Sequence, residues 1–328
     1  MSISFIIPYY KIETNLLTRC IDSIQALGNI VDWEILVIDD GTPQSPAQNI
    51  VNAYKDKRIT YTYIEHCGLG GARNKGILLS TKKYIQMVDS DDYLFLQQEK
   101  ELIKIIKKEE PDALIFNYKK VYGTKPTSLF TTGHIIYKGD AIEYAINNDI
   151  PPSCCRYILK KASIGDLRFT PNLLHEDEEF TTLLFLRIKQ ILITDYQPYA
   201  YYQRENSIIN SQNQETINQR FEDLLNIIYK IQYTIKHLNN NDPHIKVLSR
   251  KTHTLAMCFI VNLIRSVIIS KNIDKNLLKL KLVGLYPLPH VNYGIRYSFI
   301  RFATFTTIQV KAINFIFQLF RNFSAILK

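Results

Sequence analysis

Three aspartates fall within four residues, in Asp89-Ser90-Asp91-Asp92, directly after the mainly apolar run 84–88. In an extended segment, Asp89 and Asp91 point to the same side because they are two residues apart. Converging carboxylates repel each other unless a divalent cation neutralises them, and Mg²⁺ or Mn²⁺ is typically held by one or two carboxylates plus substrate phosphates. The pattern predicts either a metal site or a helix N-cap and turn before residue 95.

A second acidic cluster runs from Glu176 to Glu179 and opens an apparent helix in HEDEEFTTLLF. Acidic side chains in the first turn of a helix are favoured by the helix dipole. Alternatively, one of them is a general base, which must lie close to the hydroxyl that it deprotonates. The local pattern does not choose between these interpretations.

Two more polar segments follow apolar runs. The segment 39–42, DDGT, could cap a helix, form a turn, or accept hydrogen bonds from a base or sugar. Gly68, Gly70 and Gly71 precede a helical pattern, which lets the backbone approach an anion, and Arg73 adds a fork suited to phosphate. The alternative is a glycine-rich turn with a solvent-facing arginine. The segment is neither a Walker A loop nor the Rossmann fingerprint, because Arg73 stands where the last glycine of that fingerprint would be.

The elements that must position these groups alternate between strand and helix patterns. We expect strands over 3–8, 33–39, 59–65, 83–89 and 112–118, and helices over 15–27, 46–54, 71–80 and 95–108. This alternation predicts an α/β protein with a mostly parallel sheet covered on both faces. Ligands bind beyond the carboxyl ends of such strands, so the polar tips predict one continuous site.

The alternation weakens after about residue 120. We expect helices over 138–147 and 175–188, strands near 153–160 and 191–203, and helices from 216 onward with a break at 285–294. This pattern predicts a catalytic region over 1–212 and a helical C-terminal region over 213–328.

Composition excludes several classes of protein. The chain has 328 residues, of which 46% are hydrophobic, so a large core can form. Its five cysteines fit no zinc template, and we interpret them as reduced thiols of a cytosolic protein. The N-terminus lacks a basic region and a long apolar run, so a signal peptide is not expected. We also find no apolar stretch of the about 18 residues that would indicate a spanning helix. A cytoplasmic location is expected.

The net charge of +9 is concentrated at the C-terminal end. The last acidic residue is Asp274, and eight Lys and Arg follow it. On a helical projection of 308–328, the polar residues fall within an arc of about 100°; they are Lys311, Asn314, Gln318, Arg321 and Asn322. Such a basic amphipathic helix could lie on the inner face of the cell membrane, or it could pack on the catalytic domain or a partner subunit. Nucleic acid is not an expected partner, because the positive charges are sparse.

Six segments, taken in order, resemble glycosyltransferase family 2, whose members are inverting enzymes with the GT-A fold. They are SFIIPYY, WEILVIDDGTPQ, GLGGARNKGI, YIQMVDSDDYL, HEDEEF and YAYYQRENSI, and they span about residues 1–210. One such motif is weak evidence, but six in the family's order are specific. The chain departs from the pattern at His66, where the family often has Asn, and at Thr42-Pro43, which replaces the usual continuation of DDGS.

The resemblance implies a role for each motif. Mn²⁺ or Mg²⁺ would bind Asp91, with Asp89 close to the ribose or the metal. Asp177 would be the catalytic base, and Glu176 would support it or the acceptor. Asp39 would contact the nucleobase, and Arg73 would lie near the diphosphate. The full set of implied nucleotide-sugar contacts is Pro8, Tyr10, Asp39, Asp40, Arg73, Asp89, Ser90, Arg204 and Ser207.

The resemblance therefore implies an inverting transferase that moves a sugar from a nucleotide-diphosphate donor to a hydroxyl of a glycan or lipid-linked acceptor. UDP is the expected nucleotide because it is the most frequent in the family. One alternative is a sugar-phosphate nucleotidyltransferase, but that class has its glycine-rich loop directly after the first strand, where this chain has PYYKIET. A non-catalytic carbohydrate- or partner-binding module is the other alternative. Such a module would be expected to have lost the metal or base carboxylates, which are present here.

Overall fold

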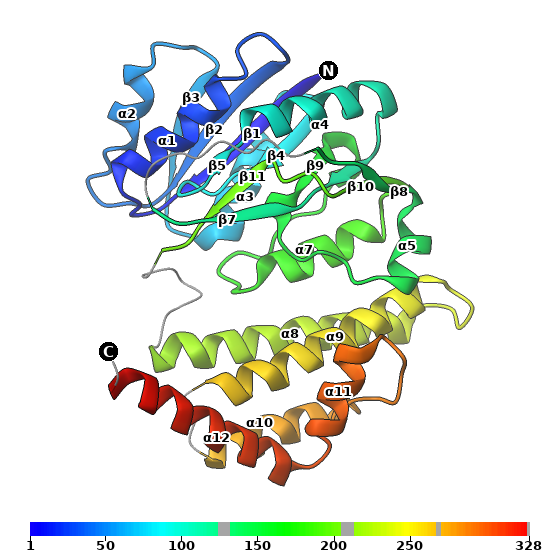
Figure 1. Ribbon diagram of the computed structural model, residues 1–328. Helices are drawn as coiled ribbons and strands as arrows, with labels where there is room; N and C mark the ends of the chain where they lie inside the picture. Colours follow the sequence, from blue (N-terminus) through cyan, green and yellow to red (C-terminus); the bar gives the residue numbers. More distant parts are fainter. Residues whose placement is uncertain (124–131, 205–212, 267–269, 327–328) are drawn as a thin grey trace. The chain divides into compact units, whose positions relative to one another are not determined.

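The computed structural model describes residues 1–123, 132–204, 213–266 and 270–326 (Figure 1). The chain divides into two compact units. The sheet unit comprises Met1–Tyr144 and Ile150–Ser207, and the helical unit comprises Ala145–Asp149 and Ile208–Lys328. The boundary predicted between residues 212 and 213 borders a segment outside the described residues, and it stays a prediction.

The main sheet of the first unit has eight described strands in the order β3-β2-β1-β4-β9-β6-β10-β8. Their bounds are β1 (Ser2–Tyr9), β2 (Asp32–Asp40), β3 (Ile59–Ile64), β4 (Tyr84–Met87), β6 (Ala113–Ile115), β8 (Ile135–Asp140), β9 (Tyr157–Lys160) and β10 (Gln190–Thr194). Strands β3, β2, β1 and β4 are mutually parallel, and β6 is parallel to β10. Strand β9 is antiparallel to both of its neighbours, and β8 is antiparallel to β10. The predicted mostly parallel α/β sheet is confirmed.

Helices lie between these strands, as the alternation predicted. They are α1 (Thr14–Gln25), α2 (Ala47–Ala53), α3 (Gly68–Leu79), α4 (Leu96–Glu109), α5 (Ala141–Asn147), η1 (Cys154–Arg156), α6 (Lys161–Ile164) and α7 (Glu176–Phe185). Strand β1 is buried along almost its whole length, as expected for a central strand covered on both faces. Gly76 brings α3 close to β1, because a Cβ there would lie 2.3 Å from a methyl carbon of Ile6.

A smaller sheet has the order β5-β11-β7. Its strands are β5 (Tyr93–Leu94), β7 (Tyr118–Val121) and β11 (Tyr199–Tyr202). Strand β5 directly follows Asp89–Asp92, so the tyrosines of β11 reach the same acidic segment.

Two predicted elements were wrong in extent. The helix predicted over 138–147 begins only at Ala141, because 135–140 pairs with β10 as an edge strand. Asp140 sets the point where the strand ends and the helix begins, since its Oδ1 accepts from the backbone N–H groups of Ile142 and Glu143. The strand predicted over 191–203 is two strands, β10 and β11, which belong to different sheets and are separated by residues 195–198.

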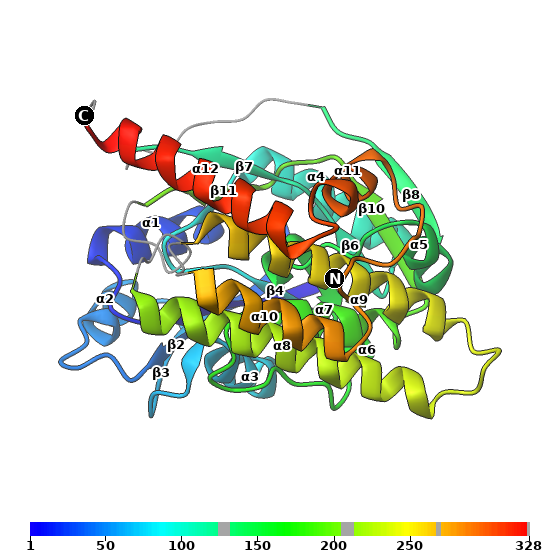
Figure 2. The same ribbon diagram turned by 90° about the horizontal axis from the view of Figure 1, so that it is seen from below.

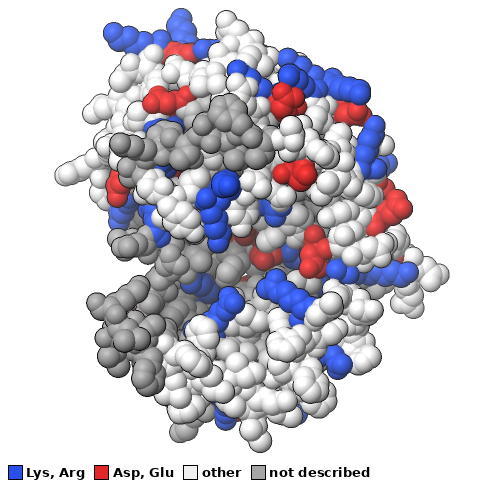
Figure 3. Space-filling view, viewed as in Figure 1, with Lys and Arg blue, Asp and Glu red and all other residues white. Residues whose placement is uncertain are grey.

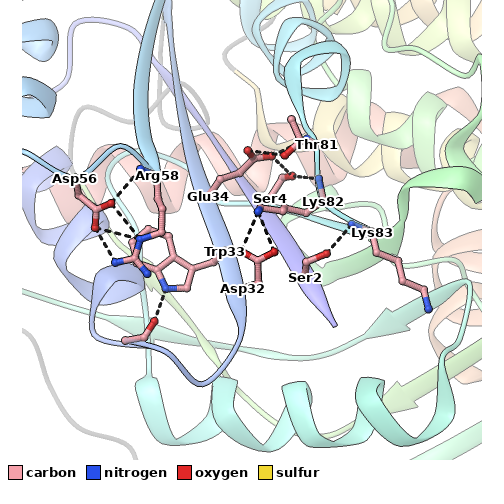
Figure 4. Close-up of polar contacts among 11 residues, drawn as sticks. Ser2, Ser4, Asp32, Trp33, Glu34, Asp56, Arg58, Thr81, Lys82 and Lys83 are labelled. Carbon is pink, nitrogen blue, oxygen red and sulfur yellow. Dashed lines mark hydrogen bonds and ion pairs between the residues drawn. The ribbon is translucent and has the colours of Figure 1, made fainter.

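The amino-terminal ends of the strands are held by a polar network of their own (Figure 4). Glu34 accepts hydrogen bonds from the Ser4 hydroxyl, at 2.6 Å, and from the backbone N–H of Thr81, also at 2.6 Å. The Arg58 guanidinium lies 3.8 Å from the ring centroid of Trp33. These polar groups bond to one another, so this edge of the sheet is structural.

The helical unit contains α8 (Gln214–His237), α9 (His244–Arg265), α10 (Ser270–Leu282), α11 (Ile295–Ala303) and α12 (Thr307–Ile326), shown from below in Figure 2. The predicted break at 285–294 is confirmed between α10 and α11. Helices α8 and α9 pack together, with the rings of Phe221 and Phe259 4.9 Å apart. Among the described helices, none combines the length and the apolar character needed to cross a bilayer.

Candidate active site

The polar tips predicted to form one site do meet at the carboxyl ends of neighbouring strands. Tyr9 at the end of β1 lies in register with Asp39 of β2. Strand β4 runs parallel to β1 on its other side, and the Val88 N–H that continues it donates to the Ile6 carbonyl. The segments that follow β1, β2 and β4 are therefore adjacent in space.

Asp39 is fully buried at the end of β2. Its Oδ1 accepts from the Thr42 N–H at 2.9 Å, and its Oδ2 accepts from the Tyr61 hydroxyl at 3.0 Å. Burial, and then the bond to Asp39, raise the pKa of Tyr61 to about 12. Asp39 thus fixes the turn at this tip. Pro8 is buried in β1 beside it, and the nucleobase contacts of both residues stay predictions.

Asp40 anchors a second feature through His66. Its Oδ1 accepts from the Cys67 N–H at 2.8 Å, and its Oδ2 lies 2.8 Å from Nδ1 of His66. The His66 ring stacks on Tyr10, with centroids 4.6 Å apart and an interplanar angle of 23°. We call Tyr10 and His66 the aromatic shelf. Gly41 makes room for it, since its φ is +77° and a Cβ would lie 2.8 Å from the backbone nitrogen of His66.

The glycines that open α3 pack against the chain itself. A Cβ on Gly70 would lie 2.9 Å from the Thr170 carbonyl oxygen, and one on Gly71 would lie 2.2 Å from Sγ of Cys67. Asn74, on the same helix, exchanges two hydrogen bonds of 2.8 Å with the backbone of Phe169. The close approach predicted for these glycines is therefore to the segment 169–172, which leads into α7.

Arg73 joins the two acidic motifs. Its side chain is buried, and its Nη1 donates to Oε1 of Glu176 at 2.5 Å. Its Nη2 donates to Oδ1 of Asp89 at 3.0 Å. The solvent-facing interpretation of Arg73 was wrong. Its position near a diphosphate stays a prediction, and its observed contacts hold Asp89 and Glu176 at one place.

The remaining acids of the first cluster have separate partners. Asp92 is buried, and its Oδ1 accepts from the Tyr202 N–H at 2.7 Å. Tyr199 links it to Asp89, because the hydroxyl accepts from the Asp89 N–H at 3.1 Å and also bonds to the Asp92 carboxyl. Burial, and then Asp91 and Asp89, hold the pKa of Asp92 well above its usual range. The N-cap interpretation was wrong, since Phe95 precedes α4 and makes no side-chain cap bond.

Asp91 lies between two arginines. Its Oδ2 accepts from Nε of Arg204 at 2.5 Å, and its carbonyl accepts from Nη2 of Arg19 at 2.6 Å. The Arg19 guanidinium carbon is 4.7 Å from the ring centroids of both Tyr93 and Tyr202. Sequence reasoning missed Arg19, because a helical projection places it outside the apolar stripe of the first helical pattern, where an exposed arginine is ordinary.

The carboxylates of Asp89 and Asp91 suit a hard divalent cation that keeps most of its water ligands. Among the described residues, no group of three or more His, Cys, Asp and Glu side chains is placed to hold a metal. Asp89 and Asp91 each use one oxygen for an arginine, so the second oxygen of each could serve as a ligand. Burial, and then Asp89, raise the pKa of Asp91, and this is the unfavourable charge that a cation would relieve.

The acids that open α7 point in different directions. Glu176 is buried against Arg73, and Glu179 is buried and accepts from the Thr170 hydroxyl at 2.6 Å. Asp177 lies between them in sequence and is half-buried, with its Oδ1 accepting from the Glu178 N–H at 3.0 Å. His175 precedes the helix in the left-handed conformation, with φ of +67°. Glu176 and Glu179 therefore hold the start of α7 to neighbouring segments, and the role of Asp177 as base stays a prediction.

The other predicted residues are placed as follows. Ser90 is buried within the acidic segment. Arg204 reaches Asp91, as described above. Ser207 lies outside the described residues, so its predicted contact with the donor has no structural account.

Comparison with known proteins identifies the family of this site. Residues 4–164 match the model described as glycosyl transferase family 2. This part of the chain belongs to glycosyltransferase family 2. All of the acidic tips except the one that opens α7 lie within the matched residues.

Curated relatives of this family 2 domain come from bacteria. The chain is 27% identical over 226 residues to glycosyltransferase GlyA of Streptococcus pneumoniae, covering 63% of this chain and 31% of that one. It is 29% identical over 216 residues to poly(ribitol-phosphate) beta-glucosyltransferase of Bacillus spizizenii, covering 62% of this chain and 33% of that one. The chain therefore spans about a third of the length of these two relatives.

A solved structure shares the fold. It is TarS 1-349 of S. aureus in complex with UDP-GlcNAc, which superposes with a TM-score of 0.60 at 17% identity. The superposition covers 98% of this chain and 92% of that one. The predicted GT-A fold is confirmed.

Proposed function

We propose that the protein is a glycosyltransferase that moves a sugar from a UDP-sugar to a hydroxyl of a glycan or lipid-linked acceptor. The observation that carries this proposal is the pair of bonds from Arg73 to Asp89 and Glu176. Through them, the segment suited to a donor and the segment suited to a base lie at one site. The UDP-GlcNAc complex of TarS and the glucosyltransferase named among the relatives support it.

We propose that the nucleobase of the donor binds at the aromatic shelf. Tyr10 and His66 offer a stacked pair of rings, and Tyr10 is 38% exposed, so a pyrimidine could extend the stack. Asp39 and Asp40 lie directly beside the shelf, where backbone and carboxylate groups could receive the hydrogen bonds of the base and ribose.

The diphosphate is proposed to lie next to Asp91 and Asp89 with Mn²⁺ or Mg²⁺. Such a cation, when bound, neutralises charge that builds up on the leaving diphosphate. Arg204 bonds to Oδ2 of Asp91, so it would share this carboxylate or turn toward the phosphates. Either position keeps a positive charge beside the leaving group.

Transfer is proposed as a single displacement. Asp177 takes the proton of the acceptor hydroxyl as that oxygen forms a bond to the anomeric carbon of the sugar. The bond from that carbon to the diphosphate oxygen breaks at the same time, and its electron pair leaves with UDP. Attack from the face opposite the diphosphate inverts the anomeric configuration. Glu176 stays with Arg73 and holds the start of α7 in place.

The acceptor is proposed to be presented at the inner face of the cell membrane. The acid-free segment after Asp274 carries eight Lys and Arg, which suits an anionic surface. A lipid-linked saccharide would then be delivered where the nucleotide sugar is made.

The deciding experiment incubates the full chain with a panel of nucleotide sugars, Mn²⁺ and lipid-linked or free saccharide acceptors. We expect release of nucleoside diphosphate together with a new glycoside of inverted configuration, measured by chromatography and NMR. Retained configuration would contradict the single displacement. Pyrophosphate release from a nucleoside triphosphate would indicate a nucleotidyltransferase, and donor binding without turnover would indicate a binding module.

A further inference from the structure

The last helix is oriented with its polar side toward its own unit. Asn314 is only 7% exposed, and its Nδ2 donates to the carbonyl of Ile264 at 2.8 Å. Gln318 donates to the carbonyl of Ser266 at 2.8 Å, and Lys311 pairs with Asp274. Asn314 and Gln318 thus cap the open carbonyl end of α9, and Lys311 ties α12 to α10. Three residues of the polar arc predicted from the sequence therefore contribute to packing within the helical unit, and the side chains of Arg321 and Asn322 lie outside the described part.

A different side of α12 is apolar and exposed. At 100° per residue, its exposed residues fall within an arc of about 200°; they are Ile308, Ala312, Phe315, Ile316, Phe317, Leu319 and Phe320. Ile308 is 80% exposed and Phe315 is 63% exposed. An amphipathic helix normally buries its apolar stripe, so this exposed stripe indicates a binding surface for a partner or a membrane.

Helix α11 and the turn after it add to this surface. Ile295, Phe299 and Phe302 have the spacing of one helix face, and they are 89%, 69% and 75% exposed. Phe305 follows at 52%. We call these residues and the exposed side of α12 the aromatic face. In Figure 3 the helical unit is mainly uncharged on the side shown, with isolated Lys and Arg.

Charge selects the occupant. Arg296 and Arg301 flank the face of α11 that carries Phe299 and Phe302, one on each side of it on a helical projection, and no acidic residue follows Asp274. A second copy of the chain would bring Arg296 and Arg301 of two identical surfaces together, which like charges oppose. Anionic lipid headgroups would attract the same cations while the phenylalanines enter the boundary between headgroups and acyl chains.

We propose that the aromatic face of α11 and α12 is the surface that binds an anionic membrane. This rests on the membrane contact in the proposed function, and it reverses the orientation that a basic amphipathic helix would suggest. The phenylalanines insert, the arginines meet the headgroups, and Lys311, Asn314 and Gln318 stay packed on the helical unit.

Vesicle flotation without donor or acceptor tests this surface independently of sugar transfer. The probes are vesicles of phosphatidylglycerol with phosphatidylcholine, and vesicles of phosphatidylcholine alone. We expect the full chain to float with the anionic vesicles, and more strongly at low salt. The triple variant Phe299→Ser, Phe302→Ser, Phe315→Ser should lose about tenfold or more of this binding. The matched control Tyr63→Ser, Leu78→Ser, Tyr233→Ser removes equally exposed apolar residues elsewhere and should bind as the wild type does.

A second readout does not depend on the fold tolerating three substitutions. The chain has one tryptophan, Trp33, which is fully buried in the sheet unit, so Phe302→Trp would add a surface reporter. Its emission should shift to the blue with anionic vesicles, whereas Tyr233→Trp on α8 should not shift. Equal flotation of the triple variant, no shift at residue 302, or no binding by the wild type would each overturn the proposal. A wild-type dimer that the triple variant makes monomeric would also overturn it, by assigning the face to a second copy.

Discussion

Asp177 is the proposed base among the acids that open α7, and two of its neighbours hold structural bonds. Glu176 is paired with Arg73, and Glu179 accepts from Thr170. We expect Asp177→Asn to lower the transfer rate by about 10²–10⁴-fold, because the amide cannot take the acceptor's proton. Its Oδ1 can still accept from the Glu178 N–H, so the helix start and the donor affinity should be unchanged. Single-turnover rates and donor titration measure the two quantities.

Asp166→Asn is the control for this variant. Its carboxylate is 90% exposed and pairs with Arg187 at the surface, so transfer should stay at the wild-type rate. A normal rate for Asp177→Asn would show that another group is the base.

Asp91 and Arg204 give a prediction about the cation. We expect Asp91→Ala to abolish Mn²⁺-dependent donor binding. We expect Arg204→Ala to bind Mn²⁺ more tightly, by up to about tenfold, because a competing positive charge has been removed from the same carboxylate. Titration followed by the electron paramagnetic resonance of free Mn²⁺ measures both without any turnover.

Arg187→Ala is the matched control, since it also breaks an arginine–aspartate pair but at the surface. Mn²⁺ affinity that is unchanged in Asp91→Ala would remove Asp91 from the metal site. Weaker Mn²⁺ binding in Arg204→Ala would show that the arginine supports the site and does not compete for it.

At this scale, residue types and spacing predicted which segments meet, and side-chain partners needed the structure. The sequence pattern suggested that Asp92 caps a helix, but its carboxyl bonds to the backbone of β11. Strand β11 is more than a hundred residues away in sequence, so no local pattern could predict this partner. His66 looked like a departure from the family pattern and forms half of the aromatic shelf. Such long-range partners leave no local periodicity to detect.

At the scale of elements, a buried carboxyl lies between α4 and β4. Glu99 is fully buried, and the one hydrogen bond found for its carboxyl group in the described chain is a long one, 3.4 Å, from the Gln86 amide. Burial raises the pKa of Glu99 to about 7 from its ordinary value of 4.5. Between these two pH values the Glu99 carboxyl is ionised in the unfolded chain and stays protonated in the folded chain. The free energy of unfolding therefore falls as pH rises through this window, by up to about 3 kcal/mol.

We expect Glu99→Gln to remove this pH dependence. The variant should be more stable than the wild type at pH 8 and nearly equal to it at pH 4.5, because the amide has no charge to bury. Urea unfolding at a series of pH values measures the difference. Glu101→Gln, on the exposed side of the same helix, is the control. Parallel pH profiles for the wild type and Glu99→Gln would contradict the predicted shift.

The alternating patterns predicted most elements of the sheet unit, because buried strands and amphipathic helices have different periods. They failed where an edge strand joins a helix at Asp140, and where residues 190–202 divide between two sheets. An edge strand is exposed, so its side chains do not show the apolar run of a central one. Assignment to a second sheet depends on β5 and β7, which are remote in sequence.

At the scale of the whole molecule, donor binding should be visible as a change in stability. A ligand at 100 times its dissociation constant stabilises the fold by about 2.7 kcal/mol. We expect UDP with Mn²⁺ to raise the melting temperature by several degrees, measured by differential scanning calorimetry. If the two units melt separately, only the transition of the sheet unit should move, since the proposed donor site lies wholly within it.

Chelation of Mn²⁺ should remove most of this shift, and adenosine diphosphate serves as the nucleotide control. An equal shift with and without the cation would contradict the proposed metal, although it would leave the nucleotide site in place.

The caps that α12 places on the end of α9 bear on how this protein is made and shortened. The carbonyls of Leu263, Ile264 and Ser266 accept hydrogen bonds from Asn314 and Gln318, which are about fifty residues further along the chain. During synthesis, α9 is therefore finished only when the last helix has left the ribosome. A chain cut before Asn314 would lose the α12 part of the aromatic face and expose the end of α9 in one step. A truncated chain therefore cannot separate the loss of membrane binding from the loss of the caps on α9, whereas single substitutions on the exposed side of α12 change only the first.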